Sequence, residues 1–170
     1  MPFNITDFKG NFTLDGARPN LFEVNIPVFN RKLTFTAKTA QLPGSTLGTI
    51  EIPYFGRTVK VAGNRTFPEW TVTVINDEDF VIRNQLERWM GRINGHESNL
   101  QRARFNQYAF DADVYQYGKQ GNIIKSYTFI DMFPVDISPI DVSWDANDAI
   151  EEFAVTFQYQ YWTSAEVAVA

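Results

Sequence analysis

The sequence has no cysteine and only one histidine, His96, among its 170 residues. Without cysteine it can form neither a disulfide bond nor a thiolate metal site. His96 precedes Glu97, but the second histidine that a metalloprotease HExxH motif requires is absent. The composition therefore argues against a zinc site and against a nucleophile activated by a Cys/His or Ser/His/Asp arrangement. We expect a protein that is not an enzyme and that uses no cofactor or metal.

Long apolar runs are also missing. No stretch approaches the ~18 apolar residues of a membrane-spanning helix. The opening MPFNITDFKG lacks the basic start and the apolar run of a signal peptide. We expect a soluble chain that is made in a cytoplasm and does not itself bind membranes.

An excess of positive charge is missing as well. Proteins that grip nucleic acid are usually basic overall, whereas this chain has a net charge of -5. Residues 1–104 hold 13 basic and 10 acidic side chains, and residues 105–170 hold 2 and 10. Two differently charged solvated surfaces would explain this asymmetry, and so would subunits whose complementary ends stack head to tail. The sequence leaves both explanations open.

Two groups of carboxylates are the remaining candidates for chemistry. Asp111 and Asp113 share one face of a predicted strand, where they suggest a metal site, a glycosidase pair or simply a solvated face. The solvated face is favoured. The acidic segment DANDAIEE, residues 145–152, reads as a turn into the last strand. The sequence thus offers no convincing active site.

What the sequence has in quantity is alternation of apolar and polar residues, which is typical of antiparallel strands with one core face. The predicted apolar faces comprise Phe22, Val24, Ile26 and Val28, then Leu33, Phe35 and Ala37, then Trp70, Val72 and Val74, then Tyr108, Phe110 and Val114, and finally Phe153, Val155, Phe157, Tyr159 and Tyr161. The predicted polar faces include Thr34, Thr36, Lys38, Thr71, Thr73, Asp111, Asp113, Thr156, Gln158 and Gln160. We predict a single domain over 1–170 that is mainly β and built of antiparallel strands.

One amphipathic helix is predicted at about 79–94. Asp77 or Asp79 is suited to cap its start, and Gly95 is suited to end it. Its apolar stripe predicts a helix packed on the sheet rather than a cofactor site, and consists of Ile82, Leu86, Trp89 and Ile93.

The stretch TIEIPYFGRTVKVAG, residues 49–63, predicts a β-hairpin within a projecting segment at 41–63. We expect its turn at Gly56-Arg57, with Ile50, Ile52 and Tyr54 alternating with Glu51, Pro53 and Phe55 before the turn and Val59 and Val61 after it. Since Pro53 cannot donate to a sheet ladder, its strand should lie at an edge or beyond the sheet. Apolar groups on both faces of a projecting hairpin require a partner, and so does the apolar N-terminal arm at 1–20.

Four segments, in order, resemble the tail tube proteins of T-even-type contractile bacteriophages. They are ARPNLFEV at 17–24, VAGNRTF at 61–67, WTVTVIND at 70–77 and DANDAIEEFAVTFQY at 145–159. The resemblance spans most of the chain, apart from the arm before Ala17, the stretch 97–107 and the tail after Trp162. Secretion-system and injection-system tube proteins are similar in fold to this family.

The resemblance implies an antiparallel β-sandwich or half-barrel with one flanking helix. It also implies a structural subunit without catalytic residues. Six copies would form a ring with a continuous inner β-barrel, and rings would stack head to tail into a channel for genome ejection. The implied partners are the tail sheath protein, a baseplate tube initiator, and a tape-measure protein that gives way to DNA in the lumen. The implied location is the virion tail, assembled in the cytoplasm of the host bacterium.

Two sets of residues follow as candidate sites. In such tubes the hairpin reaches across subunits, which assigns an inter-subunit contact to Ile52, Pro53, Tyr54, Phe55, Arg57 and Val59. The candidate lumen-facing residues are Thr34, Thr36, Thr71, Thr73, Asp111, Asp113, Thr156, Gln158 and Gln160. Two alternatives remain: the inner tube of a type VI secretion or extracellular contractile injection apparatus, and a monomeric β-sandwich that binds carbohydrate through Tyr115, Tyr117 and Trp162.

Overall fold

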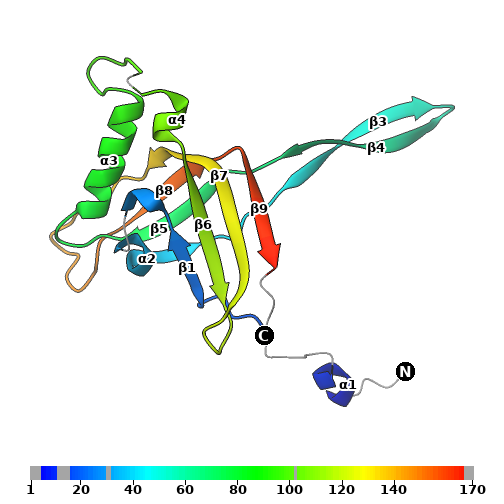
Figure 1. Cartoon of the computed structure of the whole chain (residues 1–170), viewed down its shortest axis with the longest axis horizontal. Helices are drawn as coiled ribbons and strands as arrows, with labels where there is room; N and C mark the ends of the chain where they lie inside the picture. The colour runs from blue at the N-terminus through cyan, green and yellow to red at the C-terminus, as the bar shows by residue number, and fades with distance from the viewer. Residues whose placement is uncertain (1–4, 11–15, 30–31, 102, 167–170) are drawn as a thin grey trace.

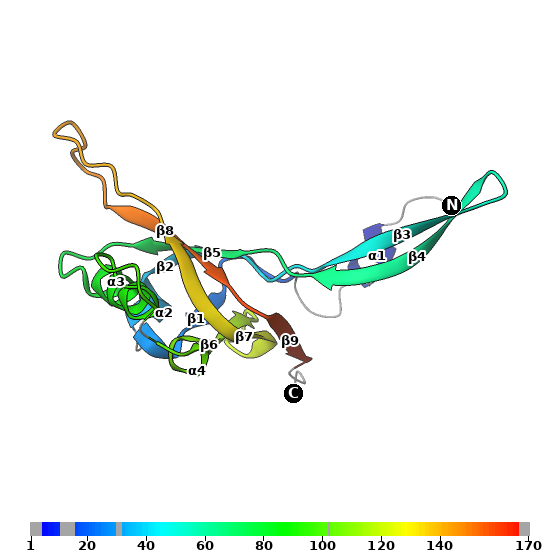
Figure 2. The same cartoon turned by 90° about the horizontal axis from the view of Figure 1, so that it is seen from above.

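The computed structural model describes residues 5–10, 16–29, 32–101 and 103–166. The body of the molecule is a strongly curved antiparallel sheet with one long helix packed against it (Figure 1). A two-stranded hairpin projects from this body, and Figure 2 shows the same projection from a second side. The predicted mainly β, antiparallel fold with one flanking helix is confirmed.

The curved sheet has seven strands in the order β1-β6-β7-β8-β5-β2, with β9 paired to β7. Among the described residues no ladder joins the edge strand β1 to the edge strand β2, so one chain forms a half-barrel rather than a closed barrel. The strands are β1 (Phe22–Asn25), β2 (Ala37–Ala40), β5 (Trp70–Ile75), β6 (Phe110–Tyr117), β7 (Ile123–Ile137), β8 (Glu152–Gln158) and β9 (Tyr161–Glu166).

The core lies on the side of the sheet that the helix covers. On the central strands β5 and β8, buried residues pair across the ladder, as Trp70 does with Phe157 and Val72 with Val155. The Trp70 ring also lies on Phe129 of β7, with ring centroids 4.5 Å apart. The period-two pattern thus correctly predicted the buried face of these strands.

The long helix α3 (Val81–Ile93) contributes the other layer of this core. Ile82, Leu86 and Trp89 are buried, as the sequence predicted, and Ile93 packs against them at the edge of the cluster. The helix begins after Phe80, which occupies the N-cap position with a positive φ of 50°. It ends at an extended Asn94, so the expected stop at Gly95 is not what terminates it.

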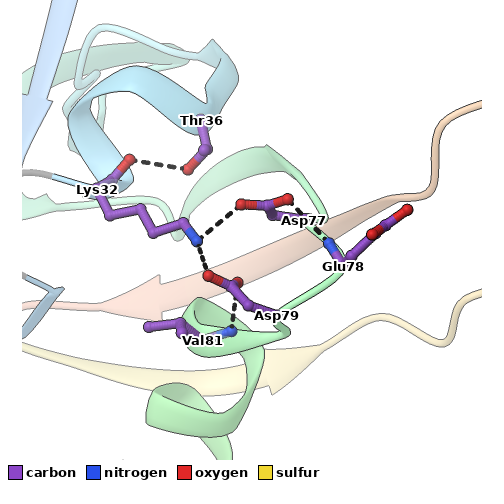
Figure 3. Close-up of polar contacts among 6 residues, drawn as sticks. All are labelled: Lys32, Thr36, Asp77, Glu78, Asp79 and Val81. Carbon is purple, nitrogen blue, oxygen red and sulfur yellow. Dashed lines mark hydrogen bonds and ion pairs between the residues drawn. The ribbon is translucent and has the colours of Figure 1, made fainter.

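Asp79 supports the start of α3 without occupying the N-cap position. Its carboxylate accepts a hydrogen bond from the Val81 amide at 3.1 Å and pairs with the Lys32 ammonium (Figure 3). Lys32 also lies 2.8 Å from Asp77, and these contacts raise the pKa of Lys32 and lower that of Asp79. The three side chains connect the start of α3 to the short helix α2 (Lys32–Thr36).

The helix α2 overturns one predicted strand. Residues 33–38 alternate in polarity, but Lys32–Thr36 are helical and only Ala37 and Lys38 enter β2. The Thr34 hydroxyl donates to the Val24 carbonyl at 3.1 Å, and the Thr36 hydroxyl donates to the Lys32 carbonyl one turn back. The local bond of Thr36 competes with a strand ladder, and the bond of Thr34 joins α2 to β1.

Other short elements also differ from the prediction. The predicted strand from Phe22 to Val28 ends at Asn25 and is followed by the 3-10 helix η1 (Pro27–Phe29). The predicted loop at 96–106 leads into α4 (Phe105–Tyr108), and a helix α1 (Ile5–Gly10) lies within the N-terminal arm. The rest of the predicted arm is described only from residue 16, so Phe3 and Phe12 lie outside the described residues.

Candidate assembly surfaces

The hairpin consists of β3 (Thr46–Tyr54) and β4 (Arg57–Thr66), which pair only with each other. Every residue of both strands is exposed except Gly63, which is half-buried. A two-stranded hairpin alone is marginally stable in water because it buries little apolar area. We therefore expect another chain to cover this hairpin and bury its exposed apolar area.

The turn of the hairpin lies one residue earlier than predicted. Phe55 (φ 45°) and Gly56 (φ 73°) are its two central residues, and Tyr54 pairs directly with Arg57. Two consecutive positive φ angles define a type I′ turn, whose twist matches that of the flanking strands. Glycine adopts this conformation readily, whereas phenylalanine does so rarely and with strain. The strained Phe55 side chain is 91% exposed at the tip.

The shifted turn changes which residues lie opposite each other, but not which residues share a face. Ile50 lies opposite Val61 and Ile52 opposite Val59, so these side chains share one face with Tyr54. On the other face, Glu51 lies opposite Lys60 and pairs with it at 3.4 Å. One face is therefore apolar along the hairpin, whereas the other is polar at Glu51 and Lys60 and carries apolar groups at Pro53 and at the exposed Phe55. The predicted apolar groups on both faces are thus present toward the tip.

Pro53 fits this register without loss of a ladder hydrogen bond. Antiparallel pairs alternate between hydrogen-bonded and non-hydrogen-bonded. Tyr54 and Arg57 close the turn as a hydrogen-bonded pair, so the neighbouring pair, Pro53 with Thr58, is of the other kind. The missing N–H of Pro53 would have pointed away from β4, consistent with the predicted edge position.

A second surface is the face of the curved sheet opposite the core and α3. On β5 and β8, Thr71, Thr73, Thr156 and Gln158 alternate with buried residues and are half-exposed. The hydroxyl oxygens of Thr71 and Thr156 lie 3.3 Å apart across the ladder. Five of the nine predicted lumen residues are thus brought to one face of the sheet: these four and Asp113 of β6.

The remaining four predicted residues are placed differently. Thr34 and Thr36 lie in α2 and bond to backbone, so they are not part of a strand face. Asp111 lies at a β-bulge, where its carboxylate accepts from the Asp131 amide at 3.0 Å. Gln160 is exposed in the bend between β8 and β9. Alternation could not reveal a helix turn, a bulge or a bend because each of them breaks the period.

The β1–β6 end of this polar face is rich in carboxylates held by hydroxyl groups. Asp113 accepts from the Thr128 hydroxyl at 2.7 Å, and Glu23 accepts from the Tyr117 hydroxyl. The bond to Glu23 raises the pKa of Tyr117 to about 12, and burial raises that of Tyr115. These acceptors give the face a negative character.

The aromatic residues of the carbohydrate-binding alternative are already engaged within the chain. Tyr117 bonds to Glu23, and the Trp162 indole donates to the Gly44 carbonyl at 2.9 Å. Tyr115, Tyr117 and Trp162 are all half-buried. They do not form an exposed stacking platform, which weakens that alternative.

The described part of the chain contains no group of three or more His, Asp or Glu residues arranged to hold a metal ion. Asp111 and Asp113 instead make the separate structural contacts given above. Within the same residues, no helix is long and apolar enough to cross a membrane.

A second segment also projects, and the sequence analysis interpreted only its acidic end, residues 145–152, as a turn. Residues 138–151 connect β7 to β8, and their exposed apolar side chains are Val142, Trp144 and Ile150. These three large apolar residues in an acidic, turn-rich segment could have indicated an interaction surface. They follow neither a helical nor a strand period, so the pattern analysis did not detect them.

Comparison with known proteins agrees with this geometry. The family model described as "Phage tail tube protein" matches residues 4–165. The chain belongs to this family. It is 33% identical over 149 residues to the tail tube protein gp19 of Enterobacteria phage T4, covering 87% of this chain and 91% of the phage T4 protein.

Among solved structures, the tail tube family fold extends to injection systems. A chain of the anti-feeding prophage baseplate matches with a TM-score of 0.68 at 12% identity, covering 92% of this chain and 100% of that one. A chain of the sheath–tube complex of an extracellular contractile injection system matches with a TM-score of 0.63 at 13% identity, covering 97% and 99%. At these identities the likeness shows the fold alone.

Proposed function

We propose that this chain is the structural subunit of the inner tube of a contractile phage tail, and that its copies form rings stacked into a channel for genome ejection. The hairpin carries this proposal, because its apolar face and tip have no partner in the rest of the described chain. Membership of the tail tube family supports the same function. The function is structural, so no catalytic residue is assigned.

Rings of six are the natural unit, as in the solved anti-feeding prophage baseplate, which has sixfold symmetry. The half-barrel leaves β1 and β2 as edges of the sheet. Pairing between the edges of neighbouring subunits would satisfy their free backbone groups and close the half-barrels into one continuous barrel. In that ring the hairpin, with Ile52, Pro53, Tyr54, Phe55, Arg57 and Val59, would contact another subunit.

The polar face of the sheet would line the channel, since α3 and the core occupy the other side. Hydroxyl, amide and carboxylate groups at Thr71, Thr73, Thr156, Gln158 and Asp113 would let DNA pass without strong attachment to its phosphates. Basic groups there would add affinity through counterion release. A neutral to negative channel wall is therefore suited to the passage of DNA rather than to its binding.

The proposed partners follow from this position in the tail. The outer surface would meet the tail sheath protein, the first ring would form on a baseplate tube initiator, and the lumen would hold a tape-measure protein before DNA. Assembly would take place in the host bacterial cytoplasm and the product would be part of the virion.

The alternative function, the inner tube of a type VI secretion or extracellular injection apparatus, is supported by the fold of the injection-system structures.

Electron microscopy and sedimentation of the purified protein test the proposal. We expect rings or tubes from the wild type, with baseplate initiator added where nucleation is slow. Phe55→Asp combined with Arg57→Glu should leave a folded monomer by circular dichroism, because hot spots favour desolvated aromatic and Arg anchors. Leu100→Asp with Arg92→Glu, a matched pair of exposed positions far along the chain from the hairpin, should still assemble. A wild type that stays monomeric at high concentration with initiator present would refute the proposal.

A further inference from the structure

The connection 138–151 between β7 and β8 projects into solvent as a loop. Every residue from Asp141 to Ile150 is exposed, and the exposed fractions of Val142, Trp144 and Ile150 are 80%, 100% and 72%. Three large apolar side chains so fully exposed on one short segment are unusual for a soluble monomer, and such patches mark interaction sites.

The base of this loop is fixed to the body of the protein. The Ser138 amide donates to the Ala154 carbonyl, and the Ala154 amide donates back to the Ser138 hydroxyl, both at 2.8 Å. At the other end, the Asn76 amide donates to the Glu151 carbonyl at 2.8 Å. The loop is therefore anchored at both ends while its apolar residues remain uncovered.

The two legs of the loop border an open hollow of about 390 Å³. Its apolar walls include Ile140, Val142 and Ile150, and Asp141 and Glu151 contribute carboxylates. A hollow with this mixed apolar and acidic lining is suited to an aromatic side chain accompanied by a basic one.

The hairpin tip presents that combination. Phe55 is 91% exposed, and Arg57 is exposed two residues later. The hairpin strands carry Arg57, Lys60 and Arg65 against one acid, Glu51, whereas the loop 138–151 carries Asp141, Asp145, Asp148 and Glu151 with no basic residue. The two surfaces are complementary in charge, and complementary charge sets the register of association.

The hairpin and the loop lie at opposite ends of the molecule. In Figure 1 and Figure 2 the loop before β8 and the tip of β3–β4 point away from the body in opposite directions. They cannot meet within one chain in this conformation. A contact between them must join two copies head to tail, and a contact of this kind closes into a ring or continues as an open polymer.

We propose that the loop 138–151 of one copy receives the hairpin tip of the next copy, with Phe55 in the hollow between the loop legs and Arg57 beside Asp141 and Glu151. This inference rests on the proposed tube function and names the surface that the hairpin binds. Trp144 and Val142 then cover the apolar face of the hairpin near its tip, so that both exposed apolar surfaces become buried by one contact. In this arrangement the basic excess of residues 1–104 and the acidic excess of residues 105–170 would contribute to opposite, complementary ends of the subunit.

Cysteine cross-linking between copies tests the contact directly, because the natural chain has no cysteine. One preparation carries Phe55→Cys and a second carries Val142→Cys, Ala146→Cys or Ile150→Cys. The two are mixed before polymerisation and oxidised after it. We expect a covalent dimer on a non-reducing gel for at least one loop position, since a disulfide requires Cβ atoms within about 4.5 Å. The control pairs Phe55→Cys with Leu100→Cys, which should not cross-link.

A charge exchange gives a second readout. Arg57→Glu alone should reduce the yield of tubes at least tenfold, and adding Asp141→Arg should restore most of it. Tubes that form normally while no loop position cross-links and the charge exchange gives no rescue would overturn this inference and leave the tube function intact. Failure of the wild type to form rings or tubes would instead refute the proposed function itself.

Discussion

Lys38 and Glu152 form a salt bridge between the edge strand β2 and the start of β8, with Nζ 2.6 Å from Oε1. The strand β5 lies between them in the sheet, so the pair spans a neighbouring strand. Lys38 is the one basic side chain among the polar strand residues named from the sequence, and in the structure it lies beside an acid. This pairing offsets a positive charge beside the face proposed to line the channel.

Glu152→Gln should make the proposed channel wall more adhesive to DNA. The substitution leaves Lys38 without its carboxylate, and each Lys contact to phosphate adds affinity that falls with salt. Stability should change by less than about 1 kcal/mol, because exposed ion pairs contribute little. We expect polymerised tubes to bind DNA more tightly at low salt, with a steeper salt dependence. The double variant with Lys38→Met should bind as the wild type does; equal binding by all three would place this pair outside the channel.

Trp89→Ala should lower the free energy of unfolding by about 3–5 kcal/mol, the range for truncation of a buried large aromatic. Trp89 is 3% exposed, packs on Phe29 and Phe157, and donates its indole N–H to the Tyr108 carbonyl at 2.7 Å. Denaturant unfolding measures the change. Trp144→Ala is the matched control, because Trp144 is fully exposed and its loss should leave monomer stability within about 0.5 kcal/mol. Similar losses in both variants would contradict the assignment of Trp89 to the core.

Tyr117 should ionise with a pKa of about 12, against 10.0 for a free phenol, because its hydroxyl donates to the Glu23 carboxylate. A group whose pKa is raised on folding stabilises the protein fully below its unfolded pKa, and this contribution is lost as the pH rises through the folded value. The loss is therefore expected between pH 10 and about 12. Glu23→Gln should bring the phenol pKa back toward 10.0. Phenolate absorbance during a pH titration measures this, with Tyr117→Phe identifying the signal; an unchanged titration in Glu23→Gln would contradict the contact.

The sequence was informative where one physical rule acts alone. On β5 and β8 the period of two predicted both the buried residues and the polar face, because these strands are central, regular and covered on one side. The apolar stripe of α3 was predicted equally well, since Ile82, Leu86 and Trp89 follow the helical period. In both cases burial and local pattern agree.

The sequence pattern was misleading where side-chain hydrogen bonds favour a helix or where a β-bulge inserts an additional residue into a strand. Thr34 and Thr36 alternate like strand residues, yet their hydroxyls satisfy backbone carbonyls and residues 32–36 form a helix. Phe55 takes a positive φ that its side chain disfavours, so no propensity could place it in the turn. Trp144 lies in an irregular loop without any period. These positions concern the candidate assembly surfaces, where the single chain does not contain the partner that would explain its residues.

Gly56→Val should separate the hairpin from the rest of the fold. Gly56 has a φ of 73°, and β3–β4 forms its own two-stranded sheet. A β-branched residue is strongly disfavoured at positive φ, so the type I′ turn should be lost. Because the hairpin residues are exposed, the melting temperature of the monomer should change little. Tube formation should fail, since the tip could no longer present Phe55 and Arg57 to the next copy.

Gly56→Asn is the control for this last variant, because asparagine tolerates the left-handed conformation that type I′ turns require. Thermal unfolding of the monomer and electron microscopy of the polymerised sample measure the two halves of the prediction. Tubes of normal yield from Gly56→Val would show that assembly does not depend on the turn. A large fall in melting temperature in Gly56→Val but not in Gly56→Asn would show instead that the hairpin is coupled to the core. The expected pattern, an unchanged monomer without tubes, follows only if the hairpin acts between copies.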